Sequence, residues 1–585
     1  MDTSVFNVGI IGLGPKGFYG FERLLAEIDQ LDDHTDMCIH LFNESDAFAT
    51  GWVYDINQPE YLLMNYPNKY ISSVPRTECD AMIPMSSYSE WVSKFTGNSI
   101  SYEEKQIAPR AAVGRYLKYY FNLLLKAGSS RVKIKKHITT VTAIKKGDSG
   151  FYIDTTTGAG AGLTFKTLLL TTGHSPAISS AYQTASNCDY TIPFVYPFDK
   201  KLTPVKSGTT VLCKGIGLTA IDTILGLTEG RDGAFKKSES GSYSYTKSGT
   251  EPFKIMPFSR SGIPIIPRGL AAINLKQTSF FLKHLVEDTL KNKRILDFEK
   301  QVLPILKVDI EAEYYHRLFK HYHYEYTPSV SIEHFRNVQK DFHKRFPKVN
   351  QFKAQSILYP KLNPESNLQQ AVKNFWEFWI IESEKKESPY AAAVAAWRFA
   401  AEDFNRLYSA NVLTPASRSI FQNKYFGLFN RVAYGPPVQN IQKMLALMQA
   451  GILDFSYAKS PQLIEKRDAC YLQTKTQKIE MDYILDARLP RGFSKEAAVL
   501  FNPIAKPALF SHTANLNAVE VKCTRQGHPV DASGAIEKNM VLYGTPTEGA
   551  LFDNDTLSRT HNDTASMWAK NTVIQYIQSK TALTT

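Results

Sequence analysis

The chain has 585 residues, of which 43% are hydrophobic and 21% are charged. These fractions are typical of a folded globular protein with large cores, and they exclude a disordered or fibrous chain. Lys and Arg number 68 and Asp and Glu number 56, so the formal net charge is +12. Over this length the excess is too diffuse to indicate nucleic-acid binding, and at roughly 100–200 residues per domain the chain should hold three or four domains.

The six cysteines are scattered and form no Cys-x-x-Cys pair. Because disulfide frameworks and zinc sites need paired cysteines, we expect neither, and we expect no other metal site. The apolar start Val8–Leu13 lacks a basic leader, and no uncharged apolar run is long enough to span a membrane. The sequence therefore predicts a cytoplasmic protein without a membrane contact.

The chain begins with a predicted buried strand, Phe6–Ile11. It leads into Gly12-Leu13-Gly14-Pro15-Lys16-Gly17 and then into an amphipathic stretch, Phe18–Leu31, that predicts a helix. In such a unit the first glycine permits a tight turn, the second lets the backbone approach a pyrophosphate, and the third lets helix and strand pack closely. The helix amino terminus offers free N–H groups to the phosphate, so we predict that residues 12–17 bind a dinucleotide. A glycine turn without a ligand is the alternative.

A second predicted strand, Met37–Phe42, should end near the ribose of that dinucleotide. An acidic residue is usual there, because a carboxylate accepts two hydroxyl hydrogen bonds. Here Asn43 stands in that place and Glu44 follows it. Either side chain could bind the ribose, and Asn43 could still accept one bond.

A similar unit occurs later in the chain, where the predicted strand Thr209–Lys214 leads into Gly215-Ile216-Gly217-Leu218-Thr219-Ala220. Ala220 replaces the third glycine, and a small residue is tolerated at that contact. Gly215, Gly217, Leu218 and Thr219 are the predicted cofactor contacts. Two such turns imply two dinucleotides, or one dinucleotide and a site that has lost its ligand.

The strand expected beside the second turn ends at Ser259 and Arg260. An acidic residue at this place would select NADH. A hydroxyl and a guanidinium instead suit the 2′-phosphate of NADPH, because Arg binds phosphate with two parallel hydrogen bonds. We therefore predict NADPH as the second cofactor, and the alternative is that Arg260 is a solvated loop residue before Gly262.

Between the two turns, an apolar strand ends in Thr171-Thr172-Gly173-His174-Ser175-Pro176. This pattern resembles the Ala-Thr-Gly motif of two-nucleotide flavoproteins, in which the glycine brings a crossover strand close to both cofactors. A related pattern recurs at residues 482–488, where Arg488 and Leu489 replace Thr-Gly.

Residues 541–549, near the end of the chain, resemble the late strand and turn that approach the flavin ribityl chain. Gly544 and Thr545 are the predicted contacts there. Thr545 stands where Asp is common, so this sequence departs from the usual pattern.

The motifs follow one another in a family-specific order. They are Gly12–Gly17, Gly51–Tyr54, Leu62–Pro67, Arg110–Tyr116, Gly173–Pro176, Gly215–Asp222, Ser259–Gly262 and Gly544–Gly549. In this order they resemble the FAD/NAD(P)-binding proteins with two Rossmann-like domains. More narrowly, they resemble the flavin-dependent amino-acid N-monooxygenases that oxidise aspartate to nitrosuccinate.

The resemblance implies that FAD is bound by the amino- and carboxyl-terminal parts together and that NADPH binds a domain inserted between them. NADPH would reduce the flavin at N5, and oxygen would add at C4a. The hydroperoxide would then hydroxylate the nitrogen of an amino acid or another small amine. The protein would orient the reactants and supply a dry pocket that retains the peroxide.

Four more residues are candidates for this site. Asn65 follows an apolar run in a loop that the resemblance places beside the isoalloxazine, so it could bond flavin N5 or the substrate amine; a turn residue is the alternative. Trp52 could stack on the flavin or adenine, or be a core aromatic. His174 could reach the cofactor cleft, or be a structural histidine. Arg110 could pair with a phosphate or carboxylate, or lie on a helix surface.

The predicted fold is α/β, with two Rossmann-like dinucleotide-binding domains and a helical insertion. We expect an FAD-binding domain at residues 1–200 that is completed by residues 501–585. The NAD(P)H-binding domain should comprise residues 201–269 and 431–500, with a Ser-rich loop at Lys236–Gly249. Residues 270–430 should form the helical insertion, a natural place for specificity and a lid.

Three functions fit these observations. The first is NADPH-dependent hydroxylation of an amino acid or small amine with O₂, and a basic lining from Arg268 or Arg431 would suit a dicarboxylate such as aspartate. The second is a reductase or oxidase of the same fold that never hydroxylates. The third is a nucleotide-binding module without turnover, which Asn43, Arg488 and Thr545 would favour because they depart from the usual motifs.

Overall fold

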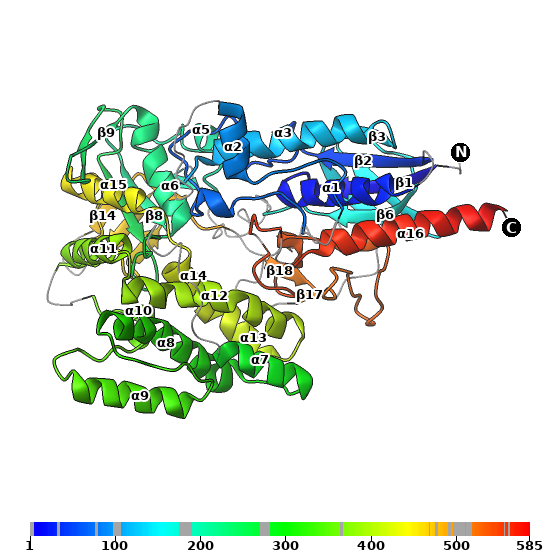
Figure 1. The fold of residues 1–585 in the computed structure, drawn as a ribbon. Helices are drawn as coiled ribbons and strands as arrows, with labels where there is room; N and C mark the ends of the chain where they lie inside the picture. The colour runs from blue at the N-terminus through cyan, green and yellow to red at the C-terminus, as the bar shows by residue number, and fades with distance from the viewer. Residues whose placement is uncertain are drawn as a thin grey trace. The chain divides into compact units, whose positions relative to one another are not determined.

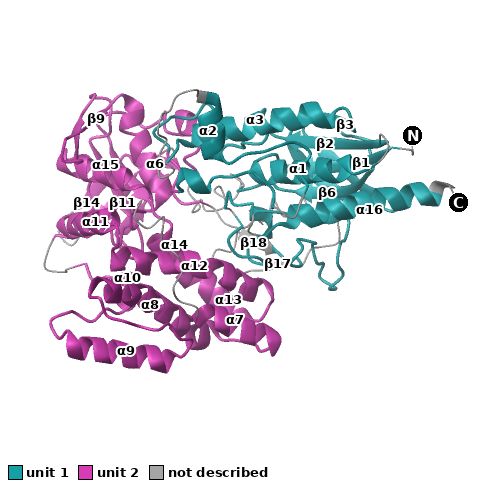
Figure 2. Cartoon of the chain, in the orientation of Figure 1, with its two compact units in different colours: residues 1–62, 66–182, 490–585 teal, residues 63–65, 183–489 magenta. Residues whose placement is uncertain are grey.

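The structure is a computed structural model that describes residues 5–31, 35–76, 80–96, 107–174, 190–269, 281–362, 367–466, 469–473, 478–489, 493–494, 509–510, 518–554, 556–559 and 562–584. The chain divides into two compact units (Figure 2). Unit 1 comprises residues 1–62, 66–182 and 490–585, and unit 2 comprises residues 63–65 and 183–489. The first and last parts of the chain therefore fold into the same unit.

Unit 1 is built on one mixed sheet. Its strands are β1 (Phe6–Ile11), β2 (Met37–Asn43), β3 (Lys133–Ile138), β4 (Val141–Gly147), β5 (Gly150–Thr155), β6 (Phe165–Leu170) and β19 (Met540–Leu542). The parallel part has the order β3-β2-β1-β6-β19. Strands β5 and β4 extend it in the antiparallel sense, starting from the first residue of β6. A strand from the carboxyl-terminal part, β19, thus completes the parallel sheet.

Helices and an apolar layer cover this sheet, which is why every residue of β1 and β2 is buried. The helices of unit 1 are α1 (Pro15–Asp29), α2 (Tyr88–Thr96), α3 (Arg110–Gly128) and α16 (Thr564–Thr584). Helix α1 packs on β1 and β6 and lies beside α16 (Figure 1). A core cluster joins Phe42 and Phe165 to Ile144 and Phe151 of the β4–β5 hairpin. A small antiparallel sheet contains β16 (Phe493–Ser494), β17 (Leu509–Phe510) and β18 (Ala518–Val521).

Unit 2 contains a second parallel sheet. Its strands are β7 (Thr191–Ile192), β8 (Thr210–Lys214), β11 (Lys254–Phe258) and β15 (Tyr483–Asp486), in the order β11-β8-β15-β7. An antiparallel sheet of β12 (Gln462–Glu465), β13 (Cys470–Gln473) and β14 (Lys478–Met481) shares a core cluster with it. Helices α5 (Phe198–Lys201), α6 (Leu218–Gly226) and α15 (Val438–Gln449) belong to the same part of the chain.

The middle of the chain is helical, as the 3.6-residue spacing predicts. Its helices are α7 (Phe281–Lys291), α8 (Leu303–His321), α9 (Ile332–Arg345), α10 (Gln355–Leu358), α11 (Leu368–Glu384), α12 (Pro389–Ser409), α13 (Pro415–Ile420) and α14 (Phe426–Ala433). Helix α12 begins where Ser388 Oγ accepts a hydrogen bond from the Ala391 N–H at 3.1 Å. Its buried alanines, which include Ala392 and Ala395, let it pack closely against α8.

One local prediction is wrong. Residues 236–249, expected as a loop, contribute to a β-hairpin of β9 (Ala234–Lys237) and β10 (Tyr243–Thr246). The rings of Phe235 and Tyr245, which oppose each other across the hairpin, lie 4.7 Å apart. Such cross-strand aromatic pairs stabilise a hairpin even where the turn is rich in serine and glycine.

The predicted fold class is confirmed. Each unit has a set of parallel strands, one of which, β1 or β8, is followed by a glycine turn and a helix, and helices fill the middle of the chain. Within the part of the chain that the structure describes, no helix has both the length and the apolar character that crossing a membrane requires.

Candidate dinucleotide-binding sites

The first glycine turn lies at the carboxyl end of β1. Gly12 has φ +88°, and a Cβ there would lie 2.7 Å from the carbonyl oxygen of Thr171, so the turn requires glycine. A Cβ on Gly17 would lie 2.2 Å from the carbonyl oxygen of Gly12. A Cβ on Gly14, in contrast, would have no protein atom within 4 Å. Protein atoms therefore crowd Gly12 and Gly17, whereas Gly14, the residue predicted to approach a pyrophosphate, faces open space.

The helix that follows also suits an anion. Helix α1 begins at Pro15, Gly14 stands at its N-cap without a side-chain hydrogen bond, and no acidic residue occupies the first turn. Proline is favourable at the first helical position because its missing N–H has no intrahelical partner there. The positive end of the helix dipole therefore faces the open space at Gly14.

The two candidates for the ribose contact have different surroundings. Asn43 is buried, and its Oδ1 accepts a hydrogen bond from the Leu13 N–H at 3.0 Å while its Nδ2 donates to the Ser45 carbonyl at 2.8 Å. Asn43 thus supports the glycine turn from within. Glu44 is exposed, and its carboxylate is the acidic group at the end of β2, so we expect Glu44 rather than Asn43 to bind ribose hydroxyls.

The carboxyl-terminal segment meets the first turn at Lys16. The Lys16 Nζ donates to the Ser558 carbonyl at 2.9 Å and lies 5.0 Å from the centre of the Tyr543 ring. The Lys16 Cγ lies 2.9 Å from the position that a Gly544 Cβ would take, and Thr545 is buried beside it. The structure thus brings together the predicted residues Lys16 and Gly544, which are more than 500 positions apart.

Of two more predicted segments, the one at Gly51 borders this turn. A Cβ on Gly51 would lie 3.4 Å from the Cα of Gly14, which places half-buried Trp52 in a segment beside the phosphate turn. Arg110 opens helix α3, where its N–H donates to the Leu62 carbonyl at 2.8 Å.

The crossover segment follows β6. The Thr171 N–H donates to the Ile11 carbonyl at 2.8 Å, and its hydroxyl donates to the Gly12 carbonyl. Gly173 has φ +67° and no atom near its would-be Cβ, and His174 is half-buried. Ser175 and Pro176 of the predicted motif lie outside the described residues. Thr171 therefore supports the glycine turn. This role was not predicted from the sequence, although the position of Thr171 in the Thr-Thr-Gly motif could have indicated it.

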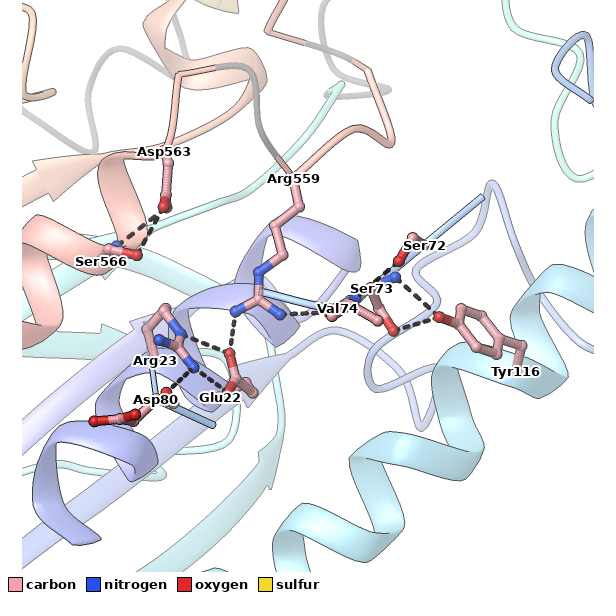
Figure 3. A network of polar contacts seen from close by, with 10 residues as sticks. All are labelled: Glu22, Arg23, Ser72, Ser73, Val74, Asp80, Tyr116, Arg559, Asp563 and Ser566. Atoms are coloured by element: carbon pink, nitrogen blue, oxygen red, sulfur yellow. Dashed lines mark hydrogen bonds and ion pairs between the residues drawn. The ribbon is translucent and has the colours of Figure 1, made fainter. Parts of the chain in front are cut away.

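A buried ionic network holds this part of unit 1 together (Figure 3). Glu22, Arg23 and Arg559 are at most 3% exposed. The Arg23 Nε donates to Glu22 Oε2 at 2.7 Å, and Arg559 pairs with the same carboxylate. Arg559 Nη1 also donates to the Ser73 carbonyl at 2.5 Å, and the Ser73 hydroxyl donates to the Tyr116 hydroxyl at 2.8 Å. This network ties the carboxyl-terminal segment to helix α1, and nothing local in the sequence indicated it.

The second glycine turn repeats the geometry of the first. Gly215 has φ +130°, and a Cβ there would lie 2.8 Å from the Ala487 carbonyl oxygen, whereas a Cβ on Gly217 would meet nothing within 4 Å. The Gly215 N–H donates to the Phe258 carbonyl at 2.8 Å, just as the Gly12 N–H donates to the Phe42 carbonyl at 2.9 Å. Helix α6 then starts at Leu218, with buried Thr219 next and no acidic residue in its first turn.

The residues after β11 form a turn of their own. The Ser259 Oγ accepts a hydrogen bond from the Gly262 N–H at 3.0 Å, so this hydroxyl caps the turn. Arg260 is exposed. Phe258 and Phe42 are equivalent, because each accepts the hydrogen bond from the first glycine of its turn. Arg260 and Glu44 each lie two residues further along the chain, so they hold equivalent places in units 2 and 1.

Asn65 lies in unit 2 and contacts Arg268. Its Nδ2 donates to the Tyr434 carbonyl at 3.3 Å, and its carbonyl accepts from Arg268 Nη1 at 3.0 Å. The Ile266 N–H donates to the carbonyl of Arg431, whose Nη2 donates to the Leu358 carbonyl at 2.7 Å.

The Nη1 of Arg431 is buried and has no hydrogen-bond partner among the described residues. Burial lowers the pKa of this arginine to about 10, and it stays charged at neutral pH. A buried cationic donor of this kind is costly unless it finds an anion.

Comparison with known proteins agrees with this geometry. Residues 9–175 match the model of a protein family described as FAD-NAD(P)-binding. The chain is 23% identical to nitrosuccinic acid synthase of Aspergillus oryzae, over 94% of this chain and 89% of that protein. It is 22% identical to an L-aspartate N-monooxygenase (nitrosuccinate-forming) of Streptomyces cremeus, over 94% and 91%. A solved structure, L-lysine 6-monooxygenase from Pseudomonas syringae, is similar with a TM-score of 0.42 and 11% identity, over 98% and 99% of the two chains.

The amino-terminal part of unit 1 is therefore an FAD-NAD(P)-binding domain. The resemblance to the nitrosuccinate-forming aspartate N-monooxygenases, expected from the motif order, is confirmed along nearly the whole chain.

Proposed function

We propose that the protein is an FAD-dependent, NADPH-using monooxygenase that hydroxylates the amino nitrogen of an acidic amino acid, with aspartate as the leading substrate. The observation that carries the proposal is the pair of matching glycine turns, one in each unit, on a chain whose relatives are named as aspartate N-monooxygenases. One turn would hold FAD and the other NADPH, as a reaction with separate reductive and oxidative halves requires. We further propose a cytoplasmic location for the protein.

The residues around each turn fit the group proposed for it. In unit 1, the backbone at Gly14 and the start of α1 would bind the FAD diphosphate, and Glu44 would bind ribose hydroxyls. In unit 2, Gly217 and α6 would bind the NADPH diphosphate, and Arg260 would bind the 2′-phosphate. When bound, the flavin accepts electrons from NADPH and activates oxygen, and the chain supplies the orientation and shielding of these groups.

Two arginines of unit 2 support an acidic substrate. Arg431 presents a buried guanidinium nitrogen without a partner among the described residues, and Arg268 lies in the same unit with its Nη1 on the Asn65 carbonyl. The Nη2 of Arg431 donates to the carbonyls of Ile357 and Leu358, so Nη1 is the nitrogen that remains to bind a carboxylate by a charge-assisted hydrogen bond. We therefore propose that Arg431 binds a carboxylate of the substrate and that Asn65 helps to orient the amine.

The test has two stages. The purified protein should be yellow, and NADPH should bleach its flavin under anaerobic conditions faster than NADH does. With oxygen present, a panel of aspartate, glutamate, lysine and ornithine is then scored by product mass, because uncoupled NADPH oxidation would mimic turnover. Hydroxylated aspartate is expected. Stoichiometric peroxide with every amine would instead identify a non-hydroxylating oxidase, and a protein that binds no FAD would refute the proposal.

Substitution of Arg431 tests the substrate assignment. Arg431→Lys should raise the KM for aspartate by about tenfold or more, because lysine keeps the charge but its single nitrogen cannot hold the Ile357 and Leu358 carbonyls and reach the carboxylate as well. The rate of anaerobic flavin reduction by NADPH should stay unchanged. An unchanged KM would show that the carboxylate binds elsewhere.

A further inference from the structure

The end of strand β15 lies directly beside the second glycine turn. Asp486, the last residue of β15, pairs in register with Lys214 at the end of β8, and Gly215 follows Lys214. The Ala487 N–H then donates to the Lys214 carbonyl at 3.1 Å. This bond corresponds to the one in unit 1 from the Thr171 N–H to the Ile11 carbonyl.

The correspondence fixes the position of the next residue. Thr171 and Ala487 are the residues whose carbonyl oxygens crowd the first glycine of each turn, at 2.7 and 2.8 Å from the would-be Cβ. The residues after them, Thr172 in unit 1 and Arg488 in unit 2, therefore hold equivalent places. A neutral side chain in the first turn is replaced by a cation in the second.

Arg488 is held in a defined orientation. Its Nε donates to Asp486 Oδ1 at 2.8 Å and its Nη2 donates to Asp486 Oδ2 at 2.6 Å. The Asp486 side chain is only 12% exposed, whereas that of Arg488 is 44% exposed. A parallel two-bond pair of this kind fixes the guanidinium plane.

The guanidinium stem also lies against the turn itself. The Arg488 Cγ is 3.4 Å from the position that a Cβ on Gly215 would take. Strands β15 and β11 flank β8 on opposite sides, so Arg488 and Arg260 follow the two neighbours of the central strand. In a parallel sheet of this type a dinucleotide lies across the carboxyl ends of the strands, with its diphosphate over the central turn.

We propose that Arg488 binds the diphosphate of NADPH on the side of β8 opposite to Arg260, and that Asp486 is the positioning residue that aims it. The inference rests on the proposed assignment of NADPH to the second turn. It divides the phosphate contacts between two arginines: Arg260 binds the 2′-phosphate, which only NADP(H) carries, and Arg488 binds the diphosphate, which NAD(H) carries as well.

Ligand fragments separate these two roles. The FAD-loaded full-length protein is titrated with NADP⁺, NAD⁺ and adenosine 2′,5′-bisphosphate, and the dissociation constants are measured by calorimetry. The bisphosphate carries the 2′-phosphate and the adenosine-side phosphate. It lacks the nicotinamide-side phosphate, which lies on the side of β8 opposite to Arg260 and is the one assigned to Arg488. Arg488→Gln should weaken NADP⁺ and NAD⁺ equally, by about fivefold to tenfold, and change the bisphosphate by less than about twofold. Arg260→Gln should weaken NADP⁺ and the bisphosphate by about fivefold and leave NAD⁺ nearly unchanged.

Two more variants test the positioning role. Asp486→Asn should weaken NADP⁺ by less than Arg488→Gln does, and the double variant should be no weaker than Arg488→Gln alone, because Asp486 acts through Arg488. Arg488→Lys, which keeps the charge, should recover part of the affinity and also covers the case in which the glutamine variant does not fold. The circular dichroism spectrum and the thermal unfolding midpoint serve as the folding check, since FAD is assigned to unit 1 and these variants lie in unit 2.

The failure of this inference differs from the failure of the proposed function. Wild-type protein that binds neither NADP⁺ nor NAD⁺ would overturn both. Wild-type protein that binds NADP⁺ tightly, together with Arg488→Gln protein whose NADP⁺ affinity is within about twofold of wild type, would overturn the role of Arg488 alone. Equal loss of the bisphosphate and of NAD⁺ in Arg488→Gln would also overturn it, because that pattern reports a general disturbance of the turn.

Discussion

The two glycine turns share one backbone design and differ in the charges placed around it. In both, the first glycine donates to the end of the neighbouring strand, and the second glycine faces open space. After β2 comes the acid Glu44, and after β11 comes the base Arg260. The backbone thus provides a site for a diphosphate, and the flanking side chains decide whether the ribose carries free hydroxyls or a phosphate.

The turns also differ in how deeply the charged side chains around them are buried. The first turn is held by Lys16 on the Ser558 carbonyl and by the buried pair of Glu22 with Arg559. The second turn is flanked by the exposed side chains of Arg260 and Arg488. Buried, long-range supports suit a resident cofactor, and exposed charged contacts suit one that binds and leaves in each cycle.

The largest expected effect concerns the buried network of unit 1. Glu22→Gln would leave Arg23 and Arg559 buried without their shared carboxylate, which should cost about 3–5 kcal/mol of unfolding free energy and cause loss of FAD. Urea unfolding with FAD release as the signal measures both effects. Glu60→Gln is the matched control, because Glu60 pairs with Arg115 at the surface and should change stability by less than about 1 kcal/mol. Equal stability of the two variants would contradict the resident-cofactor interpretation.

Acid should also lower the unfolding free energy of unit 1. Burial, together with the neighbouring His137, lowers the pKa of His40 to about 3, and the His40 Nδ1 lies 3.0 Å from the His137 Nε2. His40 is therefore neutral in the folded state, whereas in the unfolded chain it gains a proton below about pH 6.5. Proton uptake by the unfolded chain should lower the unfolding free energy by about 2 kcal/mol between neutral pH and pH 5.

The pH slope can be assigned to this residue by substitution. His40→Phe should flatten the dependence of FAD release on pH between 7.5 and 5, although its stability at neutral pH will be lower because Asn7 Oδ1 loses a partner. His321→Gln, at an exposed position, should keep the wild-type slope. A slope that persists in His40→Phe would assign the acid sensitivity to other groups.

The open glycines offer the sharpest test of the two-site comparison. Alanine at Gly14 or Gly217 would clash with no protein atom, but its methyl group would occupy the space assigned to a diphosphate. Gly14→Ala should weaken FAD by about tenfold or more, and Gly217→Ala should weaken NADP⁺ to a similar extent while FAD stays bound. Gly427→Ala, in a helix with equally open space, should affect neither cofactor. Two glycine variants with the same effect on both cofactors would break the assignment of one cofactor to each turn.

The smallest effect should be a change in coenzyme preference. Arg260→Gln should lower the NADPH-to-NADH preference in anaerobic flavin reduction by about fivefold, since it removes one exposed charge-assisted contact. Lys237→Gln, an exposed residue of hairpin β9–β10, is the control and should leave the preference unchanged. A preference that survives Arg260→Gln would mean that the 2′-phosphate is bound elsewhere.

Much of this organisation was predictable from the sequence because it is local. A strand, a glycine turn and a helix need only about 25 consecutive residues, and the order of the motifs indicated which parts of the chain go together. The pairing of Glu22 with Arg559 could not be predicted, since these residues are distant in sequence. Taken singly, each would be expected as a charged residue on the surface. The role of Asn43 within the turn was likewise hidden, because an amide at a strand end serves a ribose and a backbone N–H equally well. The hairpin at 234–246 was missed because its aromatic pairs form across the strands.

The central claim is that electrons from NADPH pass to FAD and that one oxygen atom of O₂ then reaches the amino nitrogen of an acidic amino acid. It is tested most directly by supplying the FAD-loaded protein with NADPH, aspartate and oxygen-18 gas and determining the mass of the amino-acid product. We expect an aspartate-derived product that carries oxygen-18 on nitrogen and forms only when NADPH is present. Unaltered aspartate, with all the oxygen-18 recovered as peroxide or water, would contradict it.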